Sequence, residues 1–366
     1  MVLTNLHPKS GRHTMEEILS QPEVWRRCLD LLESDGNLQQ LANDLPLKIE
    51  WVFVGCGSSF YLAQVAAATW SLVTGEIGRA VPASEILLFP ALLPRPCQPV
   101  LISRSGRTSE MVEVASYLEN EQSIRTLGLT CSVDAPMQTI CTHLIQLSPA
   151  DEQSTVMTRS FTSMLLALQA LAAHRAGRRD LLDALQATAA DVGKRLDDWQ
   201  ATIQSVVDSR EFADYVFLGQ GPWFGVAQEA MLKVKEMSCS YAQAFHTLEF
   251  RHGPKAIVGP EVPLTFFMSE TGMEEETAVL EEMKELGGTT LVVTNSASSA
   301  VRQAADYLIE LDLTVPETAR TLAAVIPGQL LGLYNGLRKG LNPDHPRNLT
   351  RVVMLDSRGG PDRGEA

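Results

Sequence analysis

Apolar runs rich in β-branched and aromatic residues recur along the chain, and each ends in glycine before a helix-length amphipathic segment. The first run spans residues 51–57, and residues 215–221 reproduce its pattern 164 positions later. The same offset pairs Phe60 with Phe224. Alternation of buried strands with amphipathic helices is typical of parallel α/β units. The pattern therefore predicts an α/β protein in which one unit occurs twice.

Two further pairs of segments keep the same offset. Residues 99–102 pair with residues 263–266, and residues 129–130 pair with residues 293–294. Agreement of several segments on one offset indicates a tandem repeat. We expect each copy to form a parallel sheet flanked by helices, with right-handed crossovers and with ligands at the carboxyl ends of the strands.

The expected domain organisation follows from these copies and from the segments outside them. Residues 1–34 are predicted to form a helical extension, with one helix over residues 14–32. A polar helical stretch, residues 180–204, contains the expected boundary between the copies. We expect a first copy over 35–190, a second over 191–345 and a C-terminal segment over 346–366, whose last residues, 359–366, look disordered.

Composition narrows the class of protein. The 366 residues are 45 % hydrophobic and 20 % charged, which is typical of a globular protein with enough apolar material for two cores. The net charge of −14 argues against nucleic acid or an anionic membrane surface as a partner. Residues 1–13 lack the apolar segment of a secretory signal, and no stretch is long enough to span a bilayer, so we expect a cytoplasmic protein. Six cysteines without metal-ligand spacing predict reduced, mostly buried thiols and no metal site.

The most specific local signal is a hydroxyl-rich turn between a strand and a helix. It contains Ser103, Arg104, Ser105, Gly106 and Thr108. Such a turn directs backbone N–H groups and a helix N-terminus at one point, which suits a phosphate group. The alternative is that Ser, Gly and Thr only cap the helix.

The corresponding turn of the second copy differs in charge. It reads Ser269, Glu270, Thr271 and Gly272, and the acidic residue would oppose a phosphate. We therefore expect one phosphate-binding turn in the chain. Neither copy has the third glycine of a dinucleotide-binding loop, which argues against a dinucleotide cofactor, and no other cofactor is expected.

A charged flank is predicted on a helix of the second copy. In residues 226–237, the apolar positions form one stripe, and Glu229, Lys233 and Glu236 fall together beside it, whereas Lys235 points nearly opposite. A half-buried carboxylate with a cation one turn away could move a proton between adjacent sugar carbons. A surface ladder of ion pairs is the alternative, and the spacing does not separate the two.

Two other side chains are candidates for chemistry. His252 precedes Gly253 and Pro254, which place its imidazole on a loop, where it could transfer protons or simply be exposed. Cys56 could act as a nucleophile, but a small buried thiol is the favoured interpretation because no histidine stands beside it in the sequence.

Together these segments resemble the sugar isomerase (SIS) domain family, and in particular double-SIS chains related to the isomerase half of glucosamine-6-phosphate synthase. The resemblance runs from residues 15–22 to residues 346–349 and includes residues 103–108, 152–158 and 250–255. It implies two tandem SIS domains of flavodoxin-like, three-layer αβα architecture. It also resembles stand-alone galactosamine- and glucosamine-6-phosphate deaminases and tagatose-6-phosphate ketose/aldose isomerases.

The resemblance implies roles for particular residues. Glu236 falls on the enolisation base, Lys233 on its neighbouring lysine, and His252 on a ring-opening histidine that reaches the active site of the other subunit, which implies a homodimer. Substrate and phosphate binding fall on a further set of residues: Gly57, Ser59, Ser103, Arg104, Ser105, Thr108 and Glu152.

Two departures from the synthase limit what the resemblance implies. The chain starts about where the isomerase half would start, so we expect no glutaminase activity. The position of the synthase's imine-forming lysine holds Arg351, whose guanidinium stays protonated and cannot form that imine. The expected function is a phosphosugar aldose–ketose isomerase, acting on an amino-sugar 6-phosphate through a cis-enediol or enolamine. A non-catalytic sugar-phosphate sensor and a fructosamine-6-phosphate deglycase are the alternatives.

Overall fold

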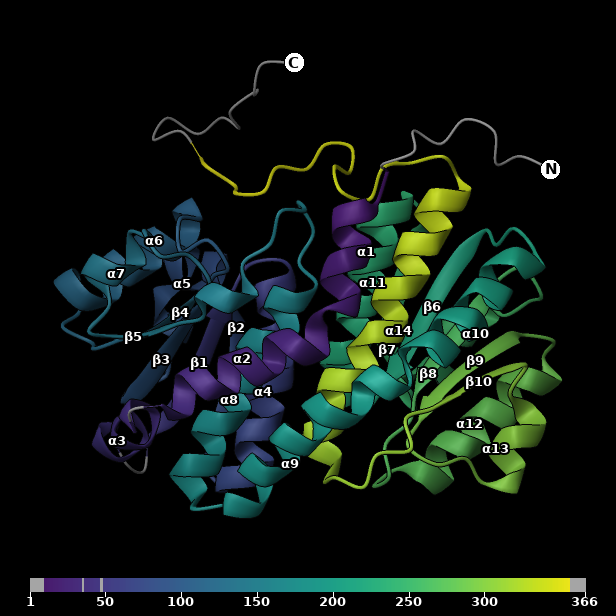
Figure 1. Cartoon of the computed structure of the whole chain (residues 1–366), viewed down its shortest axis with the longest axis horizontal. Coiled ribbons are helices and arrows are strands. Elements are labelled where there is room, and N and C mark those ends of the chain that lie inside the picture. The colour runs from purple at the N-terminus through teal and green to yellow at the C-terminus, as the bar shows by residue number, and fades with distance from the viewer. Residues whose placement is uncertain (1–9, 35, 47–48, 356–366) are drawn as a thin grey trace.

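The computed structural model describes residues 10–34, 36–46 and 49–355. Two five-stranded parallel sheets stand side by side, each between layers of helices (Figure 1). The predicted α/β fold with two tandem parallel sheets is confirmed. The predicted disorder of residues 359–366 falls outside the described residues.

The first sheet has the order β2-β1-β3-β4-β5, and the second has the order β7-β6-β8-β9-β10. The two orders are identical once each strand is matched with its counterpart 164 residues away. The first sheet contains β1 (Glu50–Gly55), β2 (Gly78–Pro82), β3 (Cys97–Ile102), β4 (Leu127–Thr130) and β5 (His143–Gln146). The second contains β6 (Asp214–Gly219), β7 (Tyr241–His246), β8 (Pro263–Phe267), β9 (Thr289–Thr294) and β10 (Tyr307–Glu310).

Helices cover both faces of each sheet, because the strands carry apolar residues on both faces and those residues must be buried. In the first copy these are α4 (Ser58–Thr74), α5 (Ala83–Leu88), α6 (Ser109–Ser116), α7 (Met137–Ile140) and α8 (Arg159–Ala176). In the second copy they are α11 (Pro222–Ser238), α12 (Met273–Glu285), α13 (Ser299–Ala304) and α14 (Glu317–Arg338). Connecting and additional helices are α1 (Arg12–Leu19), α2 (Gln21–Glu33), α3 (Asn37–Asp44), α9 (Arg179–Asp191) and α10 (Leu196–Ser209).

The largest apolar core lies between the two sheets and joins the copies. It contains side chains of α4, α8, α11 and α14 together with those of the N-terminal helices. Each sheet has a smaller core on its other face, beneath α5 and α6 in the first copy and beneath α12 and α13 in the second. The two copies therefore share their main stabilising interface. The exact boundary residues of the expected domains stay a prediction.

The N-terminal extension differs from the prediction of one helix over residues 14–32. The chain forms α1 and α2, which run in different directions and meet at Ser20 (Figure 1). Pro22 is the physical reason, because it lacks an N–H to donate back to the preceding turn and is accommodated in the first turn of α2.

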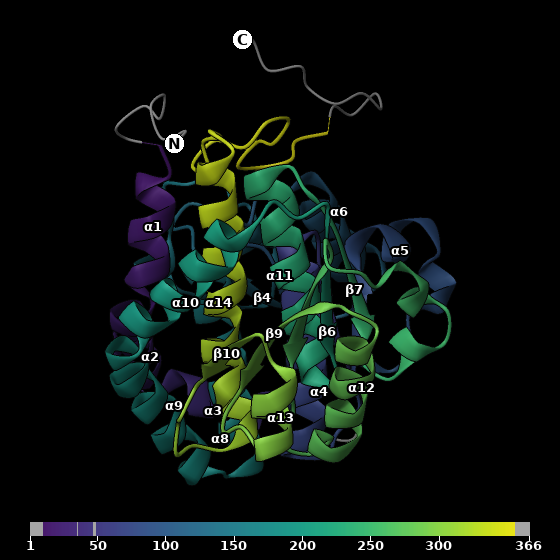
Figure 2. The ribbon, with the colours of Figure 1, turned by 90° about the vertical axis from the view of Figure 1, so that its right-hand side faces the viewer.

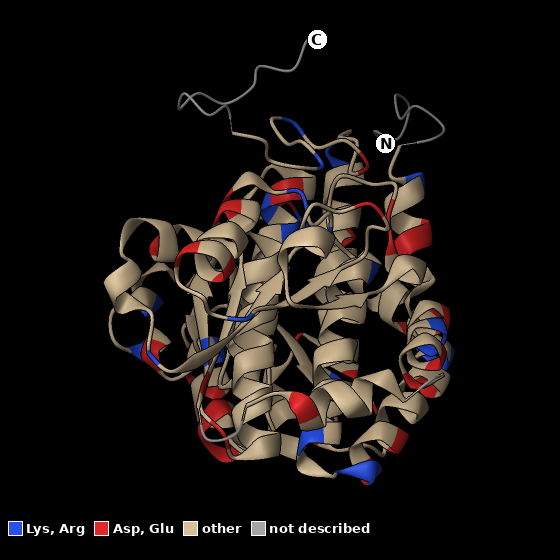
Figure 3. Cartoon of the chain, turned by 90° about the vertical axis from the view of Figure 1, so that its left-hand side faces the viewer, with Lys and Arg blue, Asp and Glu red and all other residues tan. Residues whose placement is uncertain are grey.

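The charge and the cysteines complete the comparison with expectation. In the view of Figure 3, basic residues are interspersed with acidic ones and do not form one continuous stripe. None of the helices in the described part of the chain could cross a membrane. All six cysteines are free thiols, but Cys239 is exposed and Cys56 and Cys97 are only partly buried, so the prediction of mostly buried thiols holds for three of the six.

Candidate active site

The hydroxyl-rich turn joins β3 to α6, as predicted. Gly106 adopts φ +58°, and a Cβ there would lie 2.5 Å from the Cβ of Ala135, so glycine is required by both conformation and space. Ser103 Oγ accepts a hydrogen bond from the backbone N–H of Gly106 at 3.1 Å and lies 3.5 Å from Thr108 Oγ1. Thr108 immediately precedes the first residue of α6. The turn thus gathers hydroxyls at a helix N-terminus.

A second helix begins at the same place. Gly57 takes the unusual conformation φ 56°, ψ −127° before α4, and the neighbouring Gly55 allows the backbone of Ser59 to come within 2.4 Å of where its Cβ would be. This tight turn brings Ser59 and the first N–H groups of α4 to the carboxyl end of the first sheet. Two helix N-termini, of α4 and α6, therefore flank one space, which favours a bound anion.

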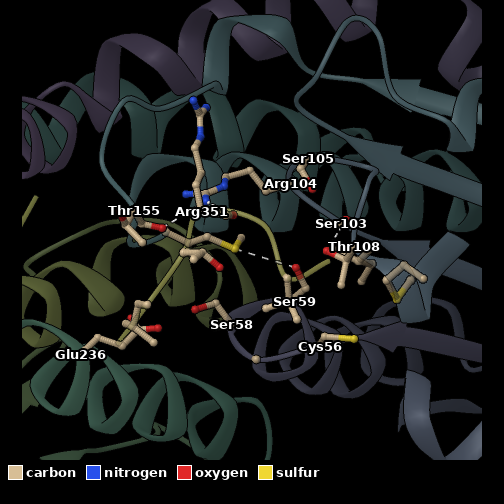
Figure 4. A pocket seen from close by; sticks show the side chains of 17 residues that line it. Cys56, Ser58, Ser59, Ser103, Arg104, Ser105, Thr108, Thr155, Glu236 and Arg351 are labelled. Carbon is tan, nitrogen blue, oxygen red and sulfur yellow. Dashed lines mark hydrogen bonds between the residues drawn. The ribbon is translucent and has the colours of Figure 1, made fainter. Parts of the chain in front are cut away.

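That space is a cavity of about 190 Å³, which we call the first cavity. Glu236 lies at one end of it, whereas Ser59, Ser103 and Thr108 lie toward the other (Figure 4). Of the residues predicted from sequence, the cavity brings together Gly57, Ser59, Ser103, Arg104, Ser105, Thr108, Glu236 and Arg351. It is also lined by Cys56, Ser58, Ile102, Met111, Thr155, Met157, Leu349, Thr350 and Val353.

The guanidinium of Arg104 is engaged in the protein's own contacts. It donates to Glu152 Oε2 at 3.2 Å, to the carbonyl of Thr155 at 3.1 Å, to the carbonyl of Val156 at 3.3 Å and to the carbonyl of Arg351 at 2.9 Å. Arg104 therefore connects the loop before α8 and the C-terminal segment to the hydroxyl-rich turn.

Glu152 is buried behind the cavity and does not line it. Its carboxylate accepts hydrogen bonds from the N–H groups of Thr158 and Ser160 and from both hydroxyls, at the N-terminus of α8. Glu17 of α1 in turn accepts from the N–H of Gln153 at 2.5 Å. Burial and the neighbouring Glu152 raise the pKa of Glu17 above its ordinary value. These carboxylates shape the loop that carries Thr155 and Met157 into the cavity.

The charged flank of α11 is confirmed and is far more buried than a surface ladder of ion pairs. The side chains of Lys233 and Glu229 are both fully buried, and that of Glu236 is 18 % exposed. Lys233 Nζ lies 3.3 Å from Glu229 Oε1, donates to Ser58 Oγ at 3.1 Å and donates to Glu236 Oε2. Lys235, on the opposite side of the helix, is exposed as predicted.

Burial and charge shift the pKa values of this group in a definite direction. Burial raises the pKa of Glu229 to about 8, partly offset by Lys233. Burial alone would lower the pKa of Lys233, but its two carboxylate partners outweigh that effect and raise it. Lys233 is therefore held as an ammonium against Glu236, the one member of the group that reaches the cavity.

His252 lies on the other side of the second sheet and does not line the first cavity. It is exposed, between the short 3₁₀ helices η5 (Glu249–Arg251) and η6 (Pro254–Ile257) that follow β7, so its predicted loop position is confirmed. Cys56 lines the cavity, but burial and the nearby Glu110 raise its thiol pKa to about 12, which argues against a nucleophilic thiolate.

The C-terminal segment covers the first cavity from outside. Its Arg351 donates to Asp151 Oδ1 at 2.6 Å. The N–H of Ser109 donates to the carbonyl of Val353, and the N–H of Leu355 donates to Ser109 Oγ. Sequence reasoning did not anticipate this cover, nor the contributions of Ser58 and Thr155. Ser58 could have been found from the repeat, because it precedes Ser59 at the start of a helix that occurs in both copies.

Among the described residues, no cluster of histidine, cysteine or acidic side chains has the arrangement of a metal site. The first cavity combines a hydroxyl-rich turn with one carboxylate, that of Glu236, to which the buried ammonium of Lys233 is bonded from outside the cavity.

The family model described as "SIS domain" matches residues 49–174 and 214–331. The two matched ranges correspond to the two sheets and their helices, and together they cover more than half of the chain. The chain therefore belongs to the SIS domain family, with two SIS domains in tandem.

Among characterised relatives, the chain is 30 % identical over 370 residues to an isomerizing glutamine–fructose-6-phosphate aminotransferase of Pseudomonas putida. The match covers 94 % of this chain and 59 % of the relative. Other aminotransferases of this name match in the same way, and the chain spans 57 % to 62 % of their length.

Two solved structures show the same fold over nearly the whole chain. Glucosamine-6-phosphate deaminase from Thermotoga maritima superimposes with a TM-score of 0.75 at 27 % identity, covering 94 % of this chain and 100 % of the other. Tagatose-6-phosphate ketose/aldose isomerase from Escherichia coli gives a TM-score of 0.78 at 22 % identity, covering 92 % and 96 %.

Proposed function

We propose that this chain is a phosphosugar aldose–ketose isomerase whose substrate is a hexose 6-phosphate that carries an amino group at C2. The observation that carries the proposal is the first cavity, which holds a hydroxyl-rich anion turn and, at its other end, a carboxylate bound to a buried ammonium. The names of the similar proteins, an aminotransferase of fructose 6-phosphate and a deaminase of glucosamine 6-phosphate, support a hexose 6-phosphate whose amino group is added or removed.

In this proposal the phosphate binds between the N-termini of α4 and α6. Ser59, Ser103, Ser105 and Thr108 supply hydroxyls, and the helix N-termini supply N–H groups and favourable dipoles. Because the phosphate is remote from the reacting carbons, its binding energy positions C1 and C2 of the open-chain sugar next to Glu236.

Glu236 is the proposed base. It removes the proton from C2 of the aldehyde form, giving an enolamine, and returns that proton to C1. The product is a 2-imino sugar, and water adds to its C2 carbon, so that ammonia leaves and a ketose 6-phosphate remains. Lys233 Nζ donates a hydrogen bond to Glu236 Oε2, which holds this carboxylate in position at the end of the cavity.

His252 is the proposed acid–base group for ring opening. Because it lies on an exposed loop away from the first cavity of its own chain, we propose that it acts on the sugar bound to the other subunit of a homodimer. Arg351 covers the cavity beside Asp151 and, as a guanidinium, does not form an imine with the ketose.

Proton NMR in D₂O tests the reaction directly. The purified protein is incubated with glucosamine 6-phosphate, galactosamine 6-phosphate or fructose 6-phosphate. Loss of the C2 proton signal of the amino sugars, or of a C1 proton signal of fructose 6-phosphate, is followed together with release of ammonium. We expect exchange with ammonium release for one amino sugar. Exchange without ammonium would leave a plain isomerase. Saturable binding without exchange would contradict the proposal in favour of a sensor or a deglycase.

Mixing variants tests whether active sites are shared between subunits. Glu236→Gln and His252→Ala chains are each expected to be inactive. If His252 acts across the interface, reassembled heterodimers contain one site with both native groups, so the mixture should regain up to about a quarter of wild-type activity by random assortment. If both groups act within one chain, the mixture stays inactive.

A further inference from the structure

The second SIS domain contains a cavity at the position equivalent to the first cavity. This second cavity has a volume of about 440 Å³. It lies at the carboxyl ends of β6 and β8 and is lined by Gly221, Pro222 and Trp223. These are the counterparts, 164 residues later, of Gly57, Ser58 and Ser59, which line the first cavity. At the position of Glu236, the second cavity has Leu72 of α4, whose side chain is exposed.

The anion-binding turn of the second cavity is occupied by the protein's own carboxylates. Glu276 accepts from the N–H of Ser269 at 2.7 Å and from its hydroxyl at 3.0 Å. Glu317 accepts from the N–H of Glu270 at 2.7 Å and from Trp223 Nε1 at 2.9 Å. The second cavity is therefore unsuited to a phosphate. The rest of its lining is mainly apolar, with Leu72, Trp223 and Leu248, although Gln220, Glu275 and Thr318 also contribute.

The loop that carries His252 also has a counterpart. The pairing of β1 with β2 has the same register as that of β6 with β7 when the offset is applied. After β2, the helix η1 (Pro90–Leu92) matches η6, so that Leu88 stands at the position of His252. Leu88, Phe89 and Leu92 are 70 %, 56 % and 65 % exposed. The first domain thus presents an apolar loop where the second presents a histidine.

The two domains pack against each other through equivalent helices, which indicates an approximate two-fold relation within the chain. Gly225 of α11 lies against Val65 and Tyr61 of α4. Because Tyr61 is the counterpart of Gly225, the same position of each helix lies at the contact, as a two-fold relation requires. In Figure 2 the segments that follow β2 and β7 project from the same side of the molecule. Both loops are therefore available to one partner on that side.

We propose that a second copy of this chain inserts the apolar loop of its first domain, Leu88 to Leu92, into the second cavity. By the same two-fold relation, the loop bearing His252 faces the first cavity of the partner. The inference rests on the proposed function only in giving His252 a catalytic role. One pair of loops would supply chemistry to the dimer, and the equivalent pair would supply apolar burial.

The surroundings of the two loops support this surface. The strands that precede the two loops, β2 and β7, each form one edge of their sheet. Most of their residues are exposed or only partly buried. Ile77 and Tyr241, equivalent residues at their starts, are 65 % and 81 % exposed. An exposed apolar strip along two edge strands is typical of an interface.

Photocrosslinking tests the contact without relying on activity. Phe89 is replaced by p-benzoylphenylalanine in a ¹⁴N-labelled chain, which is mixed with ¹⁵N-labelled chain, irradiated and digested. We expect mixed-isotope crosslinks from position 89 to the peptides that contain Leu72, Trp223 or Leu248. The same photoprobe at Leu286, which is exposed at the end of α12, is the control and should give no such crosslink. Crosslinks within one isotope only, or to other surfaces, would contradict the inference.

Sedimentation gives a second, independent readout. We expect the wild-type chain to sediment at twice the mass of one chain at 10 µM, Phe89→Asp to dissociate at least tenfold more readily, and Leu286→Asp to behave like wild type. Circular dichroism checks that Phe89→Asp is folded. If crosslinks form as expected but no sugar is turned over, the interface stands and the proposed function fails. If sugar is turned over, Phe89→Asp dimerises normally and the photoprobe at position 89 gives no expected crosslink, the proposed function stands and the interface fails.

Discussion

Helices α4 and α11 are counterparts of equal length, and their difference shows where chemistry enters a duplicated fold. Both follow a glycine in the same unusual conformation, at Gly57 and Gly221, and both pack in the central core. Three positions along one face of α11 are charged, and the same positions of α4 are not: Glu229, Lys233 and Glu236 against Val65, Thr69 and Leu72.

The two cavities differ in the side chain that each receives from the helix of the other domain, and in whether a carboxylate occupies the turn. The first cavity is open to a ligand at its anion turn and receives Glu236 from the helix of the other domain. The second cavity receives Leu72, and Glu276 occupies its turn. The two domains therefore share the geometry of two sites, but only the first has both a turn free of internal carboxylates and a carboxylate at its other end. A small number of substitutions on one scaffold suffices for such divergence.

The largest expected effect is on turnover and comes from replacing Glu236, the carboxylate that only the first cavity receives. Glu236→Gln keeps the shape of the first cavity but removes the only carboxylate that α11 presents to it, so turnover should fall by about 10²–10⁴-fold while sugar-phosphate binding is retained. The C2-proton exchange assay measures the loss, and calorimetric titration measures the binding. Lys235→Gln, on the exposed side of α11, is the matched control and should turn over normally. Near-normal exchange by Glu236→Gln would remove the proposed base.

Removing the buried cation should have the next largest effect, and on stability as well as on activity. Lys233→Met leaves Glu229 buried without its partner. Because burial already raises the pKa of Glu229 to about 8, the carboxyl can take up a proton, and the expected loss is that of an unpaired buried polar group, about 1–3 kcal/mol of unfolding free energy. Urea unfolding measures the change. Adding Glu229→Leu, which restores toward the apolar residue found at the equivalent position of α4, should recover most of the stability but no activity. Failure of the double variant to recover would mean that Lys233 stabilises the fold in another way.

Much of this comparison could be predicted from the sequence, because it depends on local patterns. The repeat offset, the turn after β3 and the shared flank of Glu229, Lys233 and Glu236 all follow from period and spacing. Burial could not be predicted in this way. A helical wheel places Lys233 beside an apolar stripe, but only the packing of α11 against α4 and α14 shows that its ammonium is fully enclosed.

The residues that sequence reasoning placed differently are those whose partners lie far away in the chain. Arg104 and Glu152 are expected to bind substrate. The structure shows that their side chains hold together the loop before α8 and the C-terminal segment, and that Arg104 also lines the first cavity. The partners of Arg104 extend to Arg351, 247 residues away. Spacing along the chain carries no information about such contacts, and the same holds for the cover that Thr350 and Arg351 form over the first cavity.

A matched pair of serines sharpens the comparison of the two anion turns. Ser103 and Ser269 are counterparts, since the hydroxyl of each accepts a hydrogen bond from the backbone N–H three residues later. Only Ser103 lies in a turn that is free of an internal carboxylate. Ser103→Ala should weaken sugar-phosphate binding about 10- to 100-fold, since a hydrogen bond to a charged group is worth about 1.5–3 kcal/mol. Titration in the Glu236→Gln background measures the affinity without turnover. Ser269→Ala should leave it unchanged, and equal weakening by both would mean that the phosphate site has been misplaced.

The smallest expected effect concerns the carboxylate that occupies the second turn. Burial raises the pKa of Glu276 from 4.5 to about 7, so between these values the folded protein retains a proton that the unfolded chain has released. Raising the pH across that window therefore favours unfolding, by at most about 1.4 kcal/mol per pH unit for one proton, and the effect ends above the folded pKa. Glu276→Gln has no such proton to lose. Its stability relative to wild type should rise between pH 5 and 7 and then level off, which urea unfolding at several pH values would show. Other titrating groups, Glu229 among them, contribute equally to both proteins, so the difference isolates Glu276. Isomerase activity should be unchanged, because the second cavity has no part in the chemistry; a constant difference in stability across this pH range would show that Glu276 is already ionised in the folded protein.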